Sequence, residues 1–292
     1  MKFPKLKITL LSLYIALSVF FSEAAAQQQQ SSAITTKSPE IMYLGAVMEQ
    51  NTINSNTHQV LDLIQDNIVI SFSSINAKSQ IIKAQKEPLY KAIDEAVRSA
   101  NITKWQNKSF SFTLRELNSY KDIELFFGQN LDLKPWFSIS EKDIKPKTLL
   151  IINLERIAFS VDIDLPEAEV FKTNTNLLAK YNLDNLIYTN TLSFGRRAIV
   201  IVESNIEVND VKSALSGLIR KEQVSDRDKS ILANCNYRVL LLGNNSTDLD
   251  SSQPIPQVIA YIEKEINADN FGLPISFGAS YLKNNQLFNN KY

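Results

Sequence analysis

The stretch Thr189–Asn205, TNTLSFGRRAIVIVESN, reads as one long β-strand that carries a glycine and two arginines near its centre. Leu192 and Phe194 lie on one parity of this strand, whereas Ile199 and Ile201 take the other. Side chains alternate between the two faces of a strand, so a change of parity indicates a bulge, a bend or a change of packing partner. The sequence therefore predicts a long strand, Ile187–Glu203, that does not keep one regular face.

Gly195 is the expected position of the bend, because a residue without a side chain permits a sharp turn or a close backbone approach. Arg196 and Arg197 follow directly and are expected at the bend, one on each face. A second strand, Thr148–Asp164, shows the same switch. Its apolar residues are first even-numbered and then odd-numbered: Leu150, Ile152 and Leu154, then Ile157, Phe159, Val161 and Ile163.

Three helices are predicted from apolar residues that recur at helical spacing: Leu89–Ala100, Val208–Arg220 and Gln257–Asn267. A further strand, Tyr237–Leu242, ends at Gly243. Long, bent, mostly antiparallel strands joined by helices indicate an α+β fold around a curved sheet.

The chain has 292 residues, of which 44% are hydrophobic, so it can bury a substantial core. Lysine plus arginine and aspartate plus glutamate both number 31. No net charge therefore attracts the protein to nucleic acid or to an anionic membrane, and no nucleic-acid partner is expected.

Residues 1–26 have the pattern of a secretory signal peptide, with lysines ahead of the apolar run Ile8–Phe21 and small residues at Ala24–Ala26. Residues 27–40 are expected to form a flexible lead. The signal indicates only export from the cytoplasm. Full secretion, the periplasm and the outer membrane all stay open as destinations.

The sequence offers few parts for catalysis. Cys235 and His58 are its only cysteine and histidine, so an intramolecular disulfide is excluded. His58 lies in the polar stretch SNTHQV, and neither the common catalytic triads nor His-rich metal sites are expected. Its seven glycines are scattered, without a phosphate-binding loop. We expect no enzyme activity, catalytic residue, metal or cofactor; an enzyme on this chain would have to rely on carboxylates.

Five stretches, in this order, resemble the thiol-activated, cholesterol-dependent cytolysins, pore-forming toxins whose core is shared with membrane-attack-complex and perforin proteins. The stretches are YLGAVMEQN (43–51), IINLERIAFSVDIDLPEAEVF (151–171), IYTNTLSFGRRAIVIVES (187–204), ILANCNYRVLLLGNN (231–245) and LPISFGASYLKNNQ (273–286). Gly195 and Arg196 match a Tyr-Gly-Arg step of the family, with Phe194 in the tyrosine position.

The resemblance implies an elongated, soluble monomer with a bent antiparallel sheet flanked by helical bundles, here over residues 41–292. Such a monomer docks on a membrane, assembles into a ring and refolds two helical bundles into β-hairpins. Gly195 and Arg196 would then lie in the bent sheet. Gly243 and Asn244 stand where the family has a glycine pair, so a hinge is expected there.

The residues can be tested for the two membrane hairpins that the resemblance places at about 125–154 and 209–236. A transmembrane strand must alternate apolar and polar residues. The apolar candidates are Leu125, Phe127, Leu131, Leu133, Phe137 and Ile139 in the first segment, and Val211, Leu215, Ile219, Ile231, Ala233 and Cys235 in the second. The arm Thr148–Leu154 is nearly all apolar and alternates poorly.

Two departures from the family modify this expectation. Pro135 interrupts the first hairpin arm, where it removes a hydrogen bond of the strand ladder. The family's C-terminal β-sandwich, with its cholesterol-recognition residues, has no counterpart in the sequence, so cholesterol binding is not transferred.

We therefore expect the short subunit of a two-component pore, which forms homo- or hetero-oligomers and reaches its membrane through a longer cytolysin-like partner. The alternative is a secreted binding or structural protein on the same scaffold.

Overall fold

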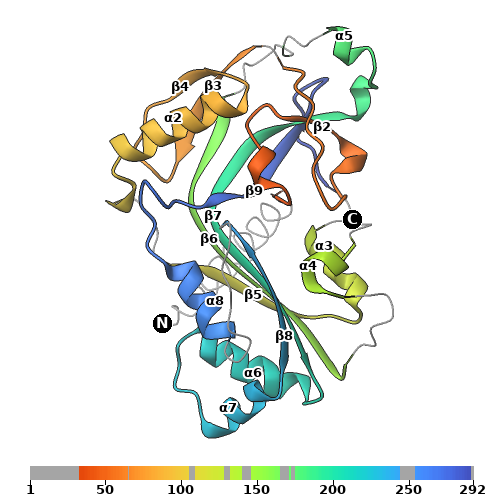
Figure 1. Cartoon of the computed structure of the whole chain (residues 1–292), viewed down its shortest axis with the longest axis vertical. Coiled ribbons are helices and arrows are strands. Elements are labelled where there is room, and N and C mark those ends of the chain that lie inside the picture. The colour runs from red at the N-terminus through yellow and green to blue at the C-terminus, as the bar shows by residue number, and fades with distance from the viewer. Residues whose placement is uncertain are drawn as a thin grey trace, which may run out of the picture.

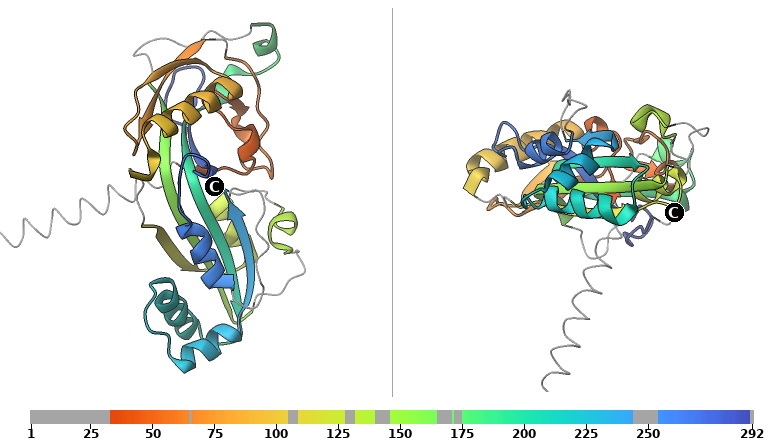
Figure 2. Two further views of the ribbon diagram at one scale, coloured as in Figure 1. Left: turned by 60° about the vertical axis from the view of Figure 1, so that its left-hand side comes forward. Right: turned by 90° about the horizontal axis from the view of Figure 1, so that it is seen from below.

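The computed structural model describes residues 33–64, 66–104, 109–127, 132–139, 146–164, 171, 175–243 and 254–290. The molecule is elongated, and two long antiparallel strands, β6 (Thr148–Asp164) and β7 (Leu186–Ser204), run along much of its length (Figure 1). Their bounds agree with the predicted strands to within one residue. The two strands curve together, as Figure 2 shows from a second side.

The upper half of the sheet surrounds the second part of β6 and the first part of β7. There the strand order is β1 (Ile34–Thr35), β9 (Leu273–Tyr281), β7, β6, β3 (Asn67–Ser73) and β4 (Gln80–Lys83). The short strand β2 (Val47–Glu49) also pairs with β7. In the lower half, β5 (Ser111–Glu116) pairs with β6 and β8 (Asn236–Leu242) pairs with β7.

Helices cover the sheet. The longer ones are α2 (Lys86–Ser99) on the upper half, and α6 (Val208–Ile219), α7 (Asp226–Ala233) and α8 (Pro254–Glu263) around the lower half (Figure 1). Single-turn helices are α3 (Glu124–Phe127), α4 (Lys134–Phe137) and α5 (Thr175–Leu178). The described residues also form 3-10 turns: η1 (Pro39–Ile41), η2 (Gln50–Thr52), η3 (Ile102–Lys104), η4 (Tyr120–Ile123) and η5 (Leu183–Asn185).

The predicted α+β class and the bent antiparallel sheet are confirmed. The first two predicted helices correspond to α2 and α6, but the third ends too late in the prediction: α8 stops at Glu263 rather than at Asn267. Arg156 of the sheet donates to the carbonyl of Glu263, the last residue of α8, and Arg196 donates to that of Glu265 just beyond it. These two buried arginines bind the chain where the helix ends.

The parity switch has different causes in the two strands. In β6 it is a bulge, because the register against β7 shifts between Ile157 and Phe159. In β7 the pairing with β6 continues without such an insertion on its own side. Ile199 and Ile201 are buried there, but so are Val200 and Val202. Both faces of β7 are covered in the lower half, so apolar residues of both parities are buried and the strand does not change face.

The prediction of a flexible lead over residues 27–40 is wrong for the second part of that range. Residues 1–32, which include the candidate signal peptide, lie outside the described residues. Residues 34–38, however, are buried: β1 pairs with β9, and the amide of Thr36 donates to the carbonyl of Ile275 at 3.1 Å. Pairing with a sheet edge orders a chain end that its polar composition alone would leave free.

Candidate functional site

Two chain segments of equal length link neighbouring antiparallel strands at the same end of the lower sheet. Residues 117–147, called the first segment, connect β5 to β6, and residues 205–235, the second segment, connect β7 to β8 (Figure 1). These bounds differ from the expected 125–154 and 209–236, because 148–154 already belong to β6.

The first segment packs on one face of the lower sheet. Phe127, Phe137 and Ile139 are buried there against the odd-numbered strand residues Leu149, Ile151, Ile199 and Ile201. Leu133 is half-buried, and Leu125 lies in α3. Leu131 falls outside the described residues. Pro135 lies in the first turn of α4, where a proline is tolerated because its missing N–H has no helical partner.

The second segment packs on the opposite face. Val211, Leu215, Ile219, Ile231 and Cys235 are buried against the even-numbered strand residues Leu150, Ile152, Leu154, Ala198, Val200 and Val202, together with α8. Ala233 is exposed, contrary to the strand-like pattern, because the helical period of α7 turns it outward. Burial raises the pKa of the Cys235 thiol, which contacts the carbonyl of Ile231.

The lower sheet is therefore covered on both faces. This arrangement explains why Thr148–Leu154 is almost continuously apolar: its even and odd side chains pack against different helical segments. The structure packs the predicted apolar residues of each segment on that segment's own face of the sheet. The two segments contribute to separate clusters.

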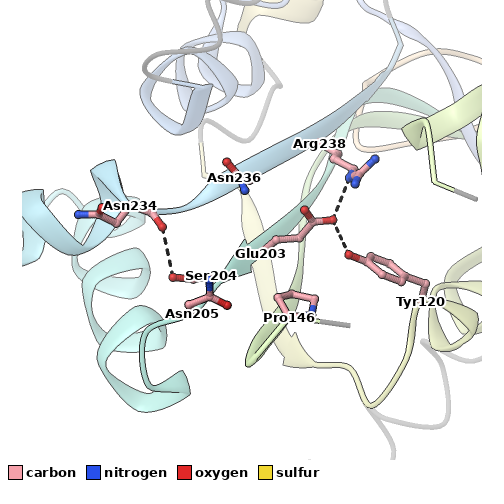
Figure 3. A pocket seen from close by; sticks show the side chains of 8 residues that line it. All are labelled: Tyr120, Pro146, Glu203, Ser204, Asn205, Asn234, Asn236 and Arg238. Atoms are coloured by element: carbon pink, nitrogen blue, oxygen red, sulfur yellow. Dashed lines mark hydrogen bonds and ion pairs between the residues drawn. The ribbon is translucent and has the colours of Figure 1, made fainter. Parts of the chain in front are cut away.

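Polar side chains from the sheet hold the first segment (Figure 3). Glu203 in β7 accepts hydrogen bonds from the Tyr120 hydroxyl and from Nε of Arg238, both at 2.8 Å. Arg238 in β8 also donates through Nη1 to the carbonyl groups of Phe137 and Ser138, at 3.1 and 2.8 Å. The three side chains border a polar cavity of about 240 Å³ between the two segments.

The buried Lys37 contacts the end of α3, one of the two short helices of the first segment. Nζ of Lys37 donates to the carbonyl groups of Ile53 at 2.6 Å and Phe127 at 3.2 Å. Burial lowers the pKa of this lysine to about 8. Its backbone N–H donates to Nε2 of His58 at 3.0 Å. Burial, and secondarily the charge of Lys37, lower the pKa of His58 to about 3, so the imidazole is neutral in the folded protein at pH 7.

The second segment makes its ion pairs at the surface. Lys212 pairs with Glu116 at 3.1 Å and Arg227 with Asp210 at 3.0 Å, and Lys147 contacts Glu207. All of these side chains are at least one-third exposed. Such exposed pairs contribute little to stability, so burial of α6 and α7 supplies most of what holds this segment.

Three glycines meet near the middle of β7. Gly195 pairs with Leu273 at the start of β9, while the next strand pair, Arg197 with Leu242, ends β8. A Cβ atom on Gly195 would lie 2.1 Å from the Arg156 carbonyl oxygen. On Gly243 or Gly272 it would lie 2.3 or 2.1 Å from the Gly195 oxygen, and both of these glycines have positive φ. Only glycine fits where β7 exchanges β8 for β9 as its neighbour.

Arg196 and Arg197 follow Gly195 in β7, and their side chains bind different parts of the chain. Arg196 is 1% exposed and donates to the carbonyls of Lys264, Glu265 and Asn270. Arg197 donates to Oδ1 of Asn153 at 2.6 Å and to Oγ1 of Thr35 at 2.7 Å. Arg196 therefore binds the chain just beyond α8, and Arg197 binds the N-terminal strand.

Several of these residues were not predicted from the sequence: Lys37, Tyr120, Arg156, Glu203, Arg238 and Gly272. A signal was present for three of them, because Arg156, Glu203 and Arg238 are charged residues inside otherwise apolar strands. Buried charges need specific partners, so such positions indicate anchoring contacts. Asn244, the second hinge candidate, lies outside the described residues.

Within the described ranges, no helix has the length and apolar character needed to cross a membrane. The side chains that the structure describes also include no cluster of His, Cys, Asp or Glu suited to a metal ion.

Comparison with known proteins assigns the chain to a family. The sequence profile of the family described as thiol-activated cytolysin matches residues 22–291. Tetanolysin from Clostridium tetani is 22% identical over 277 residues, which cover 85% of this chain and 52% of tetanolysin. Pneumolysin from Streptococcus pneumoniae is 24% identical over 154 residues, which cover 48% of this chain and 32% of pneumolysin.

The fold is also that of solved cytolysin structures. A structure of pneumolysin superimposes with a TM-score of 0.72 at 18% identity, covering 88% of this chain and 60% of that protein. Listeriolysin O gives a TM-score of 0.71 at 17% identity, covering 88% and 59%. This chain thus spans about half the length of tetanolysin and three-fifths of the structural relatives. The protein belongs to the thiol-activated cytolysin family.

Proposed function

We propose that this protein is a subunit of a membrane pore, in which the first and second segments unfold from the sheet and extend its strands as two β-hairpins. The topology supports this proposal most directly. Each segment joins two strands that are already neighbours and antiparallel, β5 with β6 and β7 with β8. Straightening either segment would lengthen an existing strand pair without changing the path of the chain.

Length and pattern are compatible with this role. Each segment could supply two arms of about 15 residues, and a transmembrane β-strand needs roughly 10. Val211, Leu215 and Ile219 are all odd-numbered, so they share one face both in helix α6 and in an extended strand. In the helix they pack on the sheet; in a hairpin the same residues would face lipid.

Assembly would use the outer strands of the lower sheet. Among the described strands, β5 and β8 are the outermost there, and an outer strand offers backbone groups for pairing with another chain. We propose homo- or hetero-oligomers, with a longer cytolysin-like partner that provides membrane recognition. Export by the signal in residues 1–26 and release from the cell are parts of the same proposal; binding of cholesterol by this chain is not.

The first test is dye release from liposomes of phosphatidylcholine with and without cholesterol. This protein, a longer homologous cytolysin, and their mixture are compared. Release only in the mixture supports the two-component pore. Release by this protein alone supports a pore but rejects the need for a partner. No release in any mixture, with both proteins bound to the liposomes, contradicts the pore and leaves a binding or structural protein on this scaffold.

A second test examines the hairpin directly. Cys235 is the only cysteine, so Cys235→Ala gives a background for single cysteines at 211 to 216, each labelled with a polarity-sensitive dye. In liposomes that leak, the hairpin predicts apolar signals at 211, 213 and 215 and aqueous signals at 212, 214 and 216. Retention of the helical pattern would contradict the conversion, because buried Ala214 would then keep an apolar signal.

A further inference from the structure

We propose that Lys37 and Arg238 form a two-point restraint that keeps the first segment closed by holding the carboxyl ends of its two short helices. The role of this restraint in a pore rests on the proposed function. Its existence in the isolated protein does not, because closure of the segment can be measured without a membrane.

Helix α4 is the first point of attachment. Its carbonyl groups near Phe137 and Ser138 lie at the end of a single turn, and the last carbonyls of a helix have no partner within it. Nη1 of Arg238 donates to both of them. Ser138 has φ of 55°, in the left-handed region, so the chain turns sharply at the place where the arginine holds it.

The arginine is itself held in position by Glu203, which is only 9% exposed. The same carboxylate oxygen accepts from Nε of Arg238 and from the Tyr120 hydroxyl. Tyr120 begins η4, near the start of the first segment, whereas Phe137 is the last residue of α4, further along the segment. Figure 3 shows this ion pair between strands β7 and β8 and its bond to Tyr120. With the bonds from Arg238 to Phe137 and Ser138, the pair binds the segment at two separated places.

Helix α3 is the second point of attachment. Its last residue, Phe127, offers its carbonyl to Nζ of Lys37, which is 7% exposed. Lys37 belongs to the buried residues 34–38, called the N-terminal strand region. That region is fixed by the pairing of β1 with β9 and by the bond from Arg197 to Thr35. The position of α3 therefore depends on an N-terminal element that is far away in the sequence.

A charged donor strengthens both contacts, and burial adds to the one that Lys37 makes. A hydrogen bond from a charged donor is stronger than one between neutral groups, and a carbonyl left unpaired in the interior loses solvation as well. The ion pairs on the second segment also have charged donors, but they lie at the surface and hold no buried carbonyl group. The first segment consequently cannot leave the sheet until β8 and the N-terminal strand region release it.

The test is hydrogen–deuterium exchange of the full chain in solution, read in peptides covering 120–127 and 132–139. Lys37→Met and Arg238→Met keep apolar bulk but remove the donors. Arg227→Met removes an exposed arginine–carboxylate pair on the second segment and is the matched control. Arg238→Lys retains the charge but cannot reproduce the forked contacts, and it serves if the methionine variant does not fold.

We expect exchange about tenfold faster at 132–139 in either Arg238 variant and at 120–127 in Lys37→Met, with 208–219 unchanged. The Arg227→Met control should leave both first-segment peptides unchanged. Unaltered exchange at 120–127 and 132–139 in folded variants would overturn the restraint, and so would an equal increase throughout the chain. Dye release is scored separately: faster exchange without leakage would retain the restraint while rejecting the pore.

Discussion

The two segments lie on opposite faces of one sheet, have the same length and both bury apolar side chains, but only the first is also held by buried and charged side chains of the sheet. The second has two helices of 12 and 8 residues and is attached mainly through apolar burial. The first has single-turn helices whose ends are bound by Lys37 and Arg238. Apolar burial is lost gradually as a helix moves away, whereas directional contacts break within a short displacement. Similar topology thus permits different conditions of release.

The largest effect that would confirm this contrast is expected from Leu215→Ala in α6. Leu215 is fully buried, so its truncation should lower the free energy of unfolding by about 3.5 kcal/mol through lost apolar burial and a residual cavity. Urea denaturation measures this change, with Ser213→Ala on the exposed side of the same helix as control. A loss below about 1 kcal/mol would show that apolar packing does not hold the second segment.

Acid should lower the stability of the region that holds the first segment, because His58 contacts Lys37 there. The folded imidazole has a pKa of about 3 and the unfolded one about 6.5, so the unfolded state binds more protons between these values. Stability is therefore lost as the pH falls below 6.5, by about 3 kcal/mol at pH 4.5 from this group alone.

The check is the free energy of unfolding of the protein and of His58→Gln at pH 7 and pH 4.5. Glutamine retains an acceptor for the Lys37 amide but does not titrate. The fall in stability between the two pH values should be smaller in the variant by about 3 kcal/mol. Equal falls would mean that the histidine does not contribute to acid sensitivity.

A pair of tyrosines gives a finer comparison. Tyr120→Phe removes a hydrogen bond to the carboxylate of Glu203 and should cost about 1.5 kcal/mol. Tyr237→Phe removes a bond to the neutral carbonyl of Leu232 in the second segment and should cost about 1 kcal/mol or less. Denaturation of both variants measures the difference; the reverse order would contradict charge-assisted anchoring of the first segment.

The smallest effect is expected for Arg227→Met. The Arg227 side chain is 74% exposed, so its pair with Asp210 should contribute less than about 0.5 kcal/mol. Unfolding at low and high salt should detect little change in either condition. A large loss that salt abolishes would mean that surface charge, rather than burial, fixes the second segment.

The strands and long helices could be predicted because each has a strong local pattern. Thr148–Asp164 appears in the structure with the predicted bounds, and Gly195 has the close backbone approach that a glycine permits. What alternation could not distinguish was a change of face from a second covered face. Ile199 and Val200 are both buried because helical segments lie on both sides of β7, which is a tertiary effect.

The site was less predictable than the fold. Apolar candidates in both segments could be chosen from spacing, and most of those described are buried. The contacts that restrain the first segment could not, because Lys37 and Phe127 are separated by 90 residues and the acceptors are backbone carbonyls. A carbonyl is present at every residue, so no sequence pattern marks the one that a buried cation will bind.

The linkage of each segment to adjacent strands has a kinetic consequence. The pairs Thr148–Ser204, Glu116–Leu150 and Glu203–Asn236 lie at the ends of the ladders from which the proposed hairpins would grow. Starting a new β-pairing requires an entropic cost of closing a loop, but these loops are already closed in the folded monomer. Growth would therefore need no separate nucleation step and would inherit its register from the existing pairs. The folded sheet would act as a seed for its own extension.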